Sequence, residues 1–242
     1  MTTVLSIMDR AEWGACTDNI VVADPSHRTL VWVPRDLWCE RFGDRINRVF
    51  AHERHRGLIR SLVDQGIGVE HSLCVRREAL ERALAGLSIT VPVSERLEFW
   101  YPLEPTRPIE EGRTLIAFEP PEERLAGERI HQWLGARYER YGRREPDGRR
   151  GPLLVIGDYG RMRRQQVLLR RLLEDGFEFA SVLADQHLVS ASGPEAIDDL
   201  AHVDRGWRFS LLEDVRKAVR DDKMVLERTT EPVPHAPAGG CR

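Results

Sequence analysis

Two short stretches place arginines beside carboxylates in a pattern that could bind phosphate. Residues 31–38 read VWVPRDLW, with Arg35 and Asp36 at the end of a strand-like apolar run, and residues 158–166 read DYGRMRRQQ. Guanidinium groups stay charged at any pH, and their planar fork of donors matches phosphoryl oxygens. If the fold brings the two stretches together, they form a pocket suited to a phosphate or pyrophosphate.

Helical angles sort the arginines of the second stretch. At about 100° per residue, five side chains fall within one arc beside an apolar stripe. They are Asp158, Arg161, Arg164, Gln165 and Leu168. Arg163 and Arg170 point away from both the arc and the stripe. Arg161 and Arg164 are therefore predicted to lie at the border of the buried face. The alternative is a charged helix surface, held by i, i+3 pairs of about 0.2–0.5 kcal/mol each.

Composition and charge are typical of a soluble globular protein without a bulk affinity for nucleic acid. The chain has 242 residues, of which 41% are apolar and 31% charged, and its formal net charge is −3. No apolar run approaches the roughly 18 residues of a membrane span, and the N-terminus has no signal-peptide pattern. The four cysteines lack the CxxC spacing of a zinc site. We expect a cytoplasmic protein with no nucleic-acid partner and no transmembrane segment, which is compatible with peripheral contact with a membrane.

Strand-like and helix-like stretches alternate along the chain. The main strand-like stretches are 4–8, 19–23, 29–33, 72–75 and 88–91. Residues 58–63 and 77–84 look helical, and the clearest helices are 127–141 and 158–175. Residues 92–121 are rich in proline and glutamate, which predicts a loop over one face. We expect a single α/β domain at 1–228, with helices packed on both faces of a mixed central sheet. A disordered tail is expected at 229–242.

Four segments occur in an order that resembles the LytR-CpsA-Psr family of cell-envelope proteins. In chain order they are TDNIVVADPSHRTLVWVPRDLW, GDRINRVFAH, LAGERIHQWLGARY and DYGRMRRQQVLLRRLL. The corresponding family motifs are an (S/T)DT-like turn leading to IPRD, then KIN, LxGExALxYxRxRY and DxxRxxRQQ. The resemblance covers about residues 4–175. It implies an α/β core and the transfer of a glycopolymer phosphate from a polyprenyl-pyrophosphate carrier to a peptidoglycan hydroxyl.

The resemblance also implies roles for individual residues. Asp9 and Asp18 match the acids that would hold Mg²⁺ on the pyrophosphate, a usual combination of hard carboxylate and phosphate oxygens. Other matched side chains would neutralise the pyrophosphate and the charge that builds on the leaving group. These are Arg35, Arg45 (where the family usually has lysine), Arg137, Arg161 and Gln165, together with Arg164 from the same helical arc.

Asp36 has two candidate roles within the implied mechanism. It could orient Arg35, or it could accept a proton from the attacking hydroxyl. Neighbouring arginines stabilise the charged carboxylate and make it a poor base, so we expect the orienting role. Arg35, Asp36 and Arg161 are thus the expected catalytic residues.

Besides Arg45, the chain departs from the family pattern at two residues, because Cys16 and Gly135 stand where the family has arginine. The family usually carries a membrane anchor ahead of the first strand, and we expect none here. Arg140 or Arg143 could compensate for the missing charge. Losing one well-placed donor from such a site costs several kcal/mol of transition-state stabilisation.

These departures leave three functional hypotheses in a definite order. We expect phosphotransferase or pyrophosphatase chemistry, dependent on Mg²⁺, on a polyprenyl- or sugar-pyrophosphate. The first alternative is a catalytically weakened protein that binds a pyrophosphate or polyprenyl phosphate. A nucleic-acid-binding regulator is the weaker alternative, because acids elsewhere balance the arginines and no DNA-reading motif surrounds them.

Overall fold

A computed structural model describes residues 2–8, 16–104, 112–136, 138–139, 159–184 and 187–212. Several residues singled out from the sequence lie outside these ranges. They are Asp9, Arg137, Arg140, Arg143 and Asp158, together with the expected tail at 229–242.

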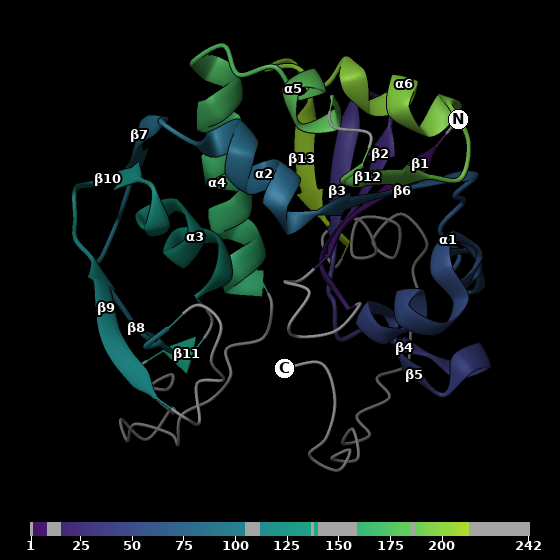
Figure 1. The fold of residues 1–242 in the computed structure, drawn as a ribbon, viewed down its shortest axis with the longest axis horizontal. Coiled ribbons are helices and arrows are strands. Elements are labelled where there is room, and N and C mark those ends of the chain that lie inside the picture. Colours follow the sequence, from purple (N-terminus) through teal and green to yellow (C-terminus); the bar gives the residue numbers. More distant parts are fainter. Residues whose placement is uncertain are drawn as a thin grey trace, which may run out of the picture.

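Six strands form the main sheet, in the order β12–β6–β1–β2–β3–β13 (Figure 1). They are β1 (Thr3–Met8), β2 (Thr17–Asp24), β3 (Thr29–Val33), β6 (His71–Arg76), β12 (Val189–Ala191) and β13 (Arg208–Leu211). β1 runs parallel to β6 and antiparallel to β2, and β13 runs parallel to β3. The expected mixed sheet is confirmed.

Helix α1 (Ile46–Asp64) covers one face of this sheet. Because side chains alternate along a strand, Ile20 and Val22 of β2 point to the same face. They share a buried cluster with Leu58 and Leu62 of α1, both of which are fully buried. A short hairpin, formed by β4 (Trp38–Cys39) and β5 (Asp44–Arg45) around the 3₁₀ turn η2 (Glu40–Phe42), connects β3 to this helix.

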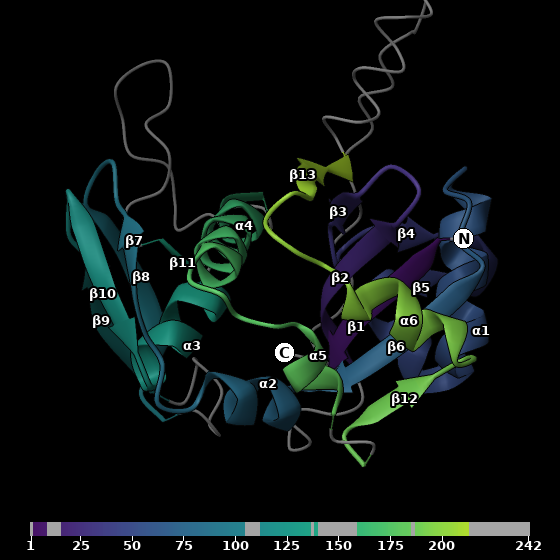
Figure 2. The ribbon, with the colours of Figure 1, turned by 90° about the horizontal axis from the view of Figure 1, so that it is seen from above.

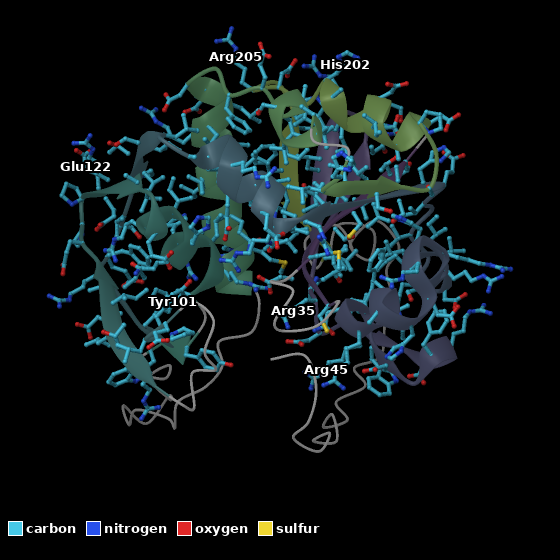
Figure 3. All side chains as sticks on the ribbon, viewed as in Figure 1. Arg35, Arg45, Tyr101, Glu122, His202 and Arg205 are labelled. Carbon is cyan, nitrogen blue, oxygen red and sulfur yellow. The ribbon has the colours of Figure 1, made fainter. Side chains whose placement is uncertain are left out.

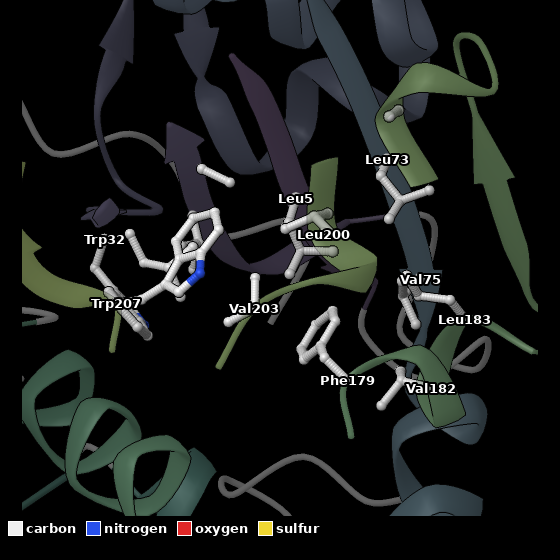
Figure 4. Packing of buried hydrophobic residues seen from close by; sticks show 14 of the residues in the cluster. Leu5, Trp32, Leu73, Val75, Phe179, Val182, Leu183, Leu200, Val203 and Trp207 are labelled. Carbon is white, nitrogen blue, oxygen red and sulfur yellow. The ribbon is translucent and has the colours of Figure 1, made fainter. Parts of the chain in front are cut away.

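The opposite face of the sheet packs against α4 (Tyr159–Glu174), α5 (Ala180–Leu183) and α6 (Glu195–Ala201). Figure 4 shows this second core, where Trp32, Phe179 and Trp207 fill the space between the sheet and the helices. Helices therefore pack on both faces, as expected. Within the described ranges, no helix has the length and apolar composition that crossing a membrane requires.

A second group of elements lies on the other side of α4 from the main sheet (Figure 2). Helix α2 (Arg77–Leu84) leads from β6 into it. The group consists of β7 (Ser88–Pro92), β8 (Leu97–Pro102), β9 (Arg113–Phe118), β10 (Glu122–Ala126), α3 (Glu128–Gly135) and β11 (Tyr138–Glu139). Phe118 anchors its core, 6.0 Å from the ring centroid of Phe99 and 4.9 Å from that of Trp133.

This second group corrects two expectations. Residues 92–121 do not form one long loop, because they contain β8 and β9, whose alternating apolar residues pair across a hairpin despite the nearby prolines. The helix expected at 127–141 ends at Gly135. Ala136 is extended, and Tyr138 then pairs with Trp100 of β8.

Helix α4 lies between two cores. Met162 and Leu173 pack against the main sheet, whereas Leu168 and Leu172 belong to the core of the second group. The outer face of the helix is exposed. Packing against both cores therefore fixes the orientation of α4 and of the polar side chains that it buries.

Candidate functional site

The candidate site forms where three segments distant in sequence meet at one end of the main sheet. Asp18 is the second residue of β2, Arg35 follows the end of β3, and Arg161 lies in the first turn of α4. Figure 3 shows Arg35 in the lower middle of the view, far from His202 and Arg205 at the top. The two arginine stretches singled out from the sequence are thus brought together.

Arg35 and Arg161 both donate to one oxygen of Asp18. Arg35 Nη1 and Arg161 Nη1 each bond to Asp18 Oδ1, the latter at 2.6 Å. Arg161 Nη2 also donates to the backbone oxygen of Asp18 at 3.1 Å. The side chains of Arg35, Arg161 and Asp18 are only 4%, 2% and 12% exposed. Charge-assisted bonds in such a poorly hydrated place are strong and geometrically specific.

This geometry suits a phosphoryl group for a specific reason. A phosphate oxygen has the same charge sign and acceptor geometry as Asp18 Oδ1, so it can take that position between the two guanidiniums. The arginines are already held in place by the surrounding elements. A ligand therefore does not have to order two long side chains, which lowers the entropic cost of binding.

Arg164 is buried beside this group but points elsewhere. Its Nε donates to the carbonyl of Trp133 at 3.2 Å and its Nη2 to the carbonyl of Ala136, and its guanidinium lies 4.4 Å from the ring centroid of Phe99. These contacts satisfy carbonyls at the C-terminal end of α3. In the described structure Arg164 fixes α3 against α4 and does not reach Asp18.

Gln165 joins α4 to β2 and α3. Its Nε2 donates to Asn19 Oδ1 and, at 3.1 Å, to the carbonyl of Leu134. Its Oε1 is buried and accepts no hydrogen bond from the residues that the structure describes. A buried acceptor without a described donor is compatible with a ligand or water that donates to it.

Asp36 and Arg45 form a pair at the surface. Arg45 Nη1 donates to Asp36 Oδ1 at 3.1 Å, and the two side chains are 42% and 44% exposed. Exposed pairs of this kind contribute about 0–1 kcal/mol. Among the described residues, the carboxylate that accepts a hydrogen bond from Arg35 is that of Asp18. Arg45 and Asp36 thus lie outside the buried group, while Asp9 and Arg137 lie outside the described residues.

Two residues that were not expected from the sequence line a small hollow beside Asp18. Arg77 of α2 and His131 of α3 share this hollow with Asp18 and Gly135, and its volume is about 20 Å³, enough for about one water molecule. A signal for Arg77 was present in the sequence. It directly follows a strand-like stretch, and β6 ends at the same sheet edge as its parallel neighbour β1.

The described residues offer an incomplete metal site. Among them, no group of three or more His, Cys, Asp or Glu side chains lies close enough to hold an ion. Mg²⁺ is usually bound through one or two carboxylates and completed by substrate phosphates and water. Asp18 fits the part of one such carboxylate, provided that a bound pyrophosphate supplies further oxygens.

Comparison with known proteins gives matches among solved structures. No protein-family model matches the sequence, and no curated protein matches it. TagT bound to LI-WTA is 13% identical with a TM-score of 0.55, and the match covers 93% of this chain and 91% of TagT. A Streptococcus agalactiae protein gives 16% identity and a TM-score of 0.56, with coverages of 87% and 75%. TagV of B. subtilis gives 16% and 0.51, with coverages of 91% and 96%.

These similarities concern the fold, because the sequence identities are low. TagT and TagV are LytR-CpsA-Psr proteins, so the resemblance first seen in four sequence segments extends to the arrangement of almost the whole chain. The protein has the LytR-CpsA-Psr fold.

Proposed function

We propose that this protein binds the pyrophosphate of a polyprenyl- or sugar-pyrophosphate and transfers the attached phosphoryl group to a hydroxyl. One observation carries the proposal: the buried guanidiniums of Arg35 and Arg161 converge on a single carboxylate oxygen of Asp18. The fold is consistent with this proposal, since TagT, a protein with a similar fold, has been solved bound to LI-WTA.

The reaction is a displacement at phosphorus. The acceptor hydroxyl oxygen forms a new bond to the phosphorus that carries the polymer, and the anhydride P–O bond breaks. The leaving polyprenyl phosphate takes the bonding electron pair, and the hydroxyl proton passes to a base or to water. If water replaces the acceptor hydroxyl, the same step is hydrolysis.

Arg35 and Arg161 would contribute by electrostatic stabilisation. Phosphoryl transfer places growing negative charge on the leaving oxygen, and fixed donors stabilise that charge without reorganising. Asp18 keeps the two guanidiniums converged when no ligand is present, and a phosphoryl oxygen then replaces it as their acceptor. Mg²⁺ held by Asp18, together with Asp9, would supply additional neutralisation of the pyrophosphate.

A second candidate function is binding without turnover. Gly135 carries no side chain where the family has an arginine, and Arg164 donates to α3 carbonyls. The described site therefore holds fewer guanidiniums for a transition state than the family pattern implies. Such a protein would hold a pyrophosphate or polyprenyl phosphate and release it unchanged.

The experiment that tests both functions measures binding and turnover separately. The protein is incubated with Mg²⁺ and a polyprenyl-pyrophosphate-linked sugar, and release of polyprenyl phosphate is followed. The Arg35→Gln variant should lose about 100-fold or more in rate, as expected for one transition-state donor. Arg205→Gln, at an exposed arginine far from Arg35 (Figure 3), is the matched control.

The outcomes distinguish the hypotheses. Tight binding without product, lost in Arg35→Gln, supports the binding function. Turnover that persists in Arg35→Gln refutes the assigned site. Absence of both binding and turnover in the wild-type protein refutes the proposal as a whole.

A further inference from the structure

The exposed face of α4 forms the floor of a second, larger groove. Its walls are the β7–β10 edge on one side and β13 on the other, and its volume is about 830 Å³. Figure 2 shows α4 between these two walls. Sites for small ligands commonly span about 300–1,000 Å³. The groove is therefore large enough to hold a ligand, and it lies on a different face of α4 from Arg161.

Three arginines line the floor of this groove, and they differ in whether a described acid forms an ion pair with them. Arg171 is 3.4 Å from Glu174 and 3.7 Å from Asp175. Arg163 and Arg170 are exposed and form no ion pair within the described part of the chain. They are seven residues apart, so they project from the same side of the helix, about 10.5 Å apart along its axis.

The neighbouring strand fixes the position of this floor. Gln166 Nε2 donates to the carbonyl of Ser210 in β13 at 3.1 Å, which ties the helix to the wall. The Arg170 guanidinium lies 5.2 Å from the ring centroid of Phe209, also in β13. Arg170 is thereby held over the wall, and Arg163 is one helical repeat away. Glu122 is the acid on the opposite wall.

We propose that this groove binds an extended chain of phosphodiester-linked polyol or sugar units, with Arg163 and Arg170 contacting separate phosphates. The proposal rests on the proposed function, because such a chain is what a glycopolymer pyrophosphate carries. The separation of the two arginines along the helix suits an anion that repeats along a chain. The groove is open, so its contacts are screened by salt.

The lining disfavours a nucleic acid as the occupant. Sites for single strands combine a basic groove with aromatic side chains on which bases stack. Among the described residues that line the groove, Phe209 is the only aromatic, and the guanidinium of Arg170 already lies over its ring. A polyol or sugar phosphate needs no stacking platform, and its phosphates need only the two cations.

The test compares a soluble poly(glycerol phosphate) chain with inorganic pyrophosphate as ligands of the whole protein. The double variant Arg163→Gln/Arg170→Gln should bind the polymer at least tenfold more weakly, from about 1 kcal/mol for each exposed contact. Its pyrophosphate affinity should be unchanged. The control Arg56→Gln/Arg205→Gln removes two exposed arginines outside the groove and should keep wild-type affinity for both ligands.

Each other result overturns the inference. Equal losses in the groove variant and the control would indicate a bulk charge effect. An unchanged polymer affinity in the groove variant would show that the polymer does not bind through Arg163 and Arg170. Tighter binding of an oligothymidylate of matched charge, lost in the groove variant, would make it a nucleic-acid site. Failure of pyrophosphate to bind the wild-type protein refutes the proposed function instead, because the polymer probe contains no pyrophosphate.

Discussion

Arg161 binds Asp18 at two points, with Nη1 2.6 Å from the carboxylate oxygen Oδ1 and Nη2 3.1 Å from the backbone oxygen. The backbone contact fixes the guanidinium relative to β2, whatever happens to the carboxylate. The side-chain contact, which is shared with Arg35, is the one that a ligand can replace. The backbone oxygen of Asp18 thus fixes the position of the Arg161 guanidinium, whereas the carboxylate of Asp18 balances the charge of the two arginines.

Replacing Asp18 should therefore separate stability from ligand binding. Asp18→Asn keeps the backbone contact but removes the negative charge between two buried guanidiniums. We expect a loss of about 3 kcal/mol of unfolding free energy, because breaking a buried charge pair is costly. Pyrophosphate should then raise the thermal midpoint of the variant more than that of the wild-type protein, since it supplies the missing anion.

Differential scanning fluorimetry with and without pyrophosphate measures both effects. Thr3→Val is a suitable control for general destabilisation, since Thr3 is buried and donates to Asp199 at 2.6 Å, away from the site. A pyrophosphate response in Asp18→Asn no larger than that of the control would contradict a phosphate position between Arg35 and Arg161.

Arg164 should contribute mainly to stability. Arg164→Met keeps most of the side-chain volume but leaves the carbonyls of Trp133 and Ala136 without their donor. We expect a loss of about 2–3 kcal/mol in urea unfolding. Arg163→Met, its exposed neighbour on the same helix, should stay within about 0.5 kcal/mol of the wild-type value.

Pyrophosphate titration of the folded Arg164→Met protein adds a second readout. Unchanged affinity would assign Arg164 to packing. A loss of affinity beyond about tenfold would instead support the substrate contact expected from the helical arc.

Arg77 should supply to the site a positive charge in place of the arginine that the family has at the position of Gly135. Its side chain is 11% exposed and lies 3.3 Å from Glu81, and it shares the hollow beside Asp18 with Gly135. We expect Arg77→Gln to weaken pyrophosphate binding about tenfold, the effect of one hydrogen bond from a charged donor. Arg82→Gln, exposed on the same helix, is the matched control.

Moving the arginine from position 77 to position 135 provides a stricter test of this role. Among the described residues, a Cβ on Gly135 would contact only Tyr101, at 3.7 Å and 3.9 Å. Arg77→Ala would vacate the volume that a longer side chain needs. The double variant Arg77→Ala/Gly135→Arg should therefore recover most of the affinity lost in Arg77→Ala. Wild-type affinity in Arg77→Gln would exclude this role for Arg77.

Local periodicity predicted the orientation of the α4 side chains correctly. The helical angle alone separated Arg161 and Gln165, which are buried, from Arg163 and Arg170, which are exposed. This succeeded because the 3.6-residue repeat is a local property, and apolar residues mark the buried side. The mixed sheet with helices on both faces followed from the same kind of pattern.

The partners of those side chains could not be predicted in the same way. Asp18 and Arg161 are 143 residues apart in the sequence, so their contact depends on how β2 and α4 pack. Arg164 belongs to the same arc as Arg161, yet it turns to the end of α3, an element whose C-terminus was misplaced from sequence. The strands β8 and β9 were missed because proline content outweighed their short alternating patterns.

His55 should make the stability of the protein depend on pH in a range where most carboxylates do not titrate. Its Nδ1 lies 3.1 Å from Ser72 Oγ and its Nε2 lies 2.8 Å from Ser190 Oγ, so it connects α1 to β6 and β12. Burial, with a smaller contribution from the charge of Arg54, lowers the pKa of His55 below its ordinary value of 6.5. The folded protein therefore favours the neutral imidazole.

The sign of the effect follows from proton uptake. As the pH falls below 6.5, the unfolded chain protonates this histidine before the folded protein does. The unfolded state then binds more protons, so the unfolding free energy decreases as the pH decreases. Urea unfolding at about pH 7.5 and about pH 5.5 should show this loss in the wild-type protein and a smaller one in His55→Gln.

Two comparisons isolate the contribution of His55. Asp24, Asp64 and Asp204 also have a lowered pKa, but their ordinary value is 3.8, so their protonation affects stability at more acidic pH. His52→Gln, which removes an exposed histidine from the same helix, is the matched control. An equal slope in His55→Gln and the wild-type protein would show that the imidazole between Ser72 and Ser190 is not the group that responds, because glutamine can keep hydrogen bonds to serine but cannot take up a proton in this range.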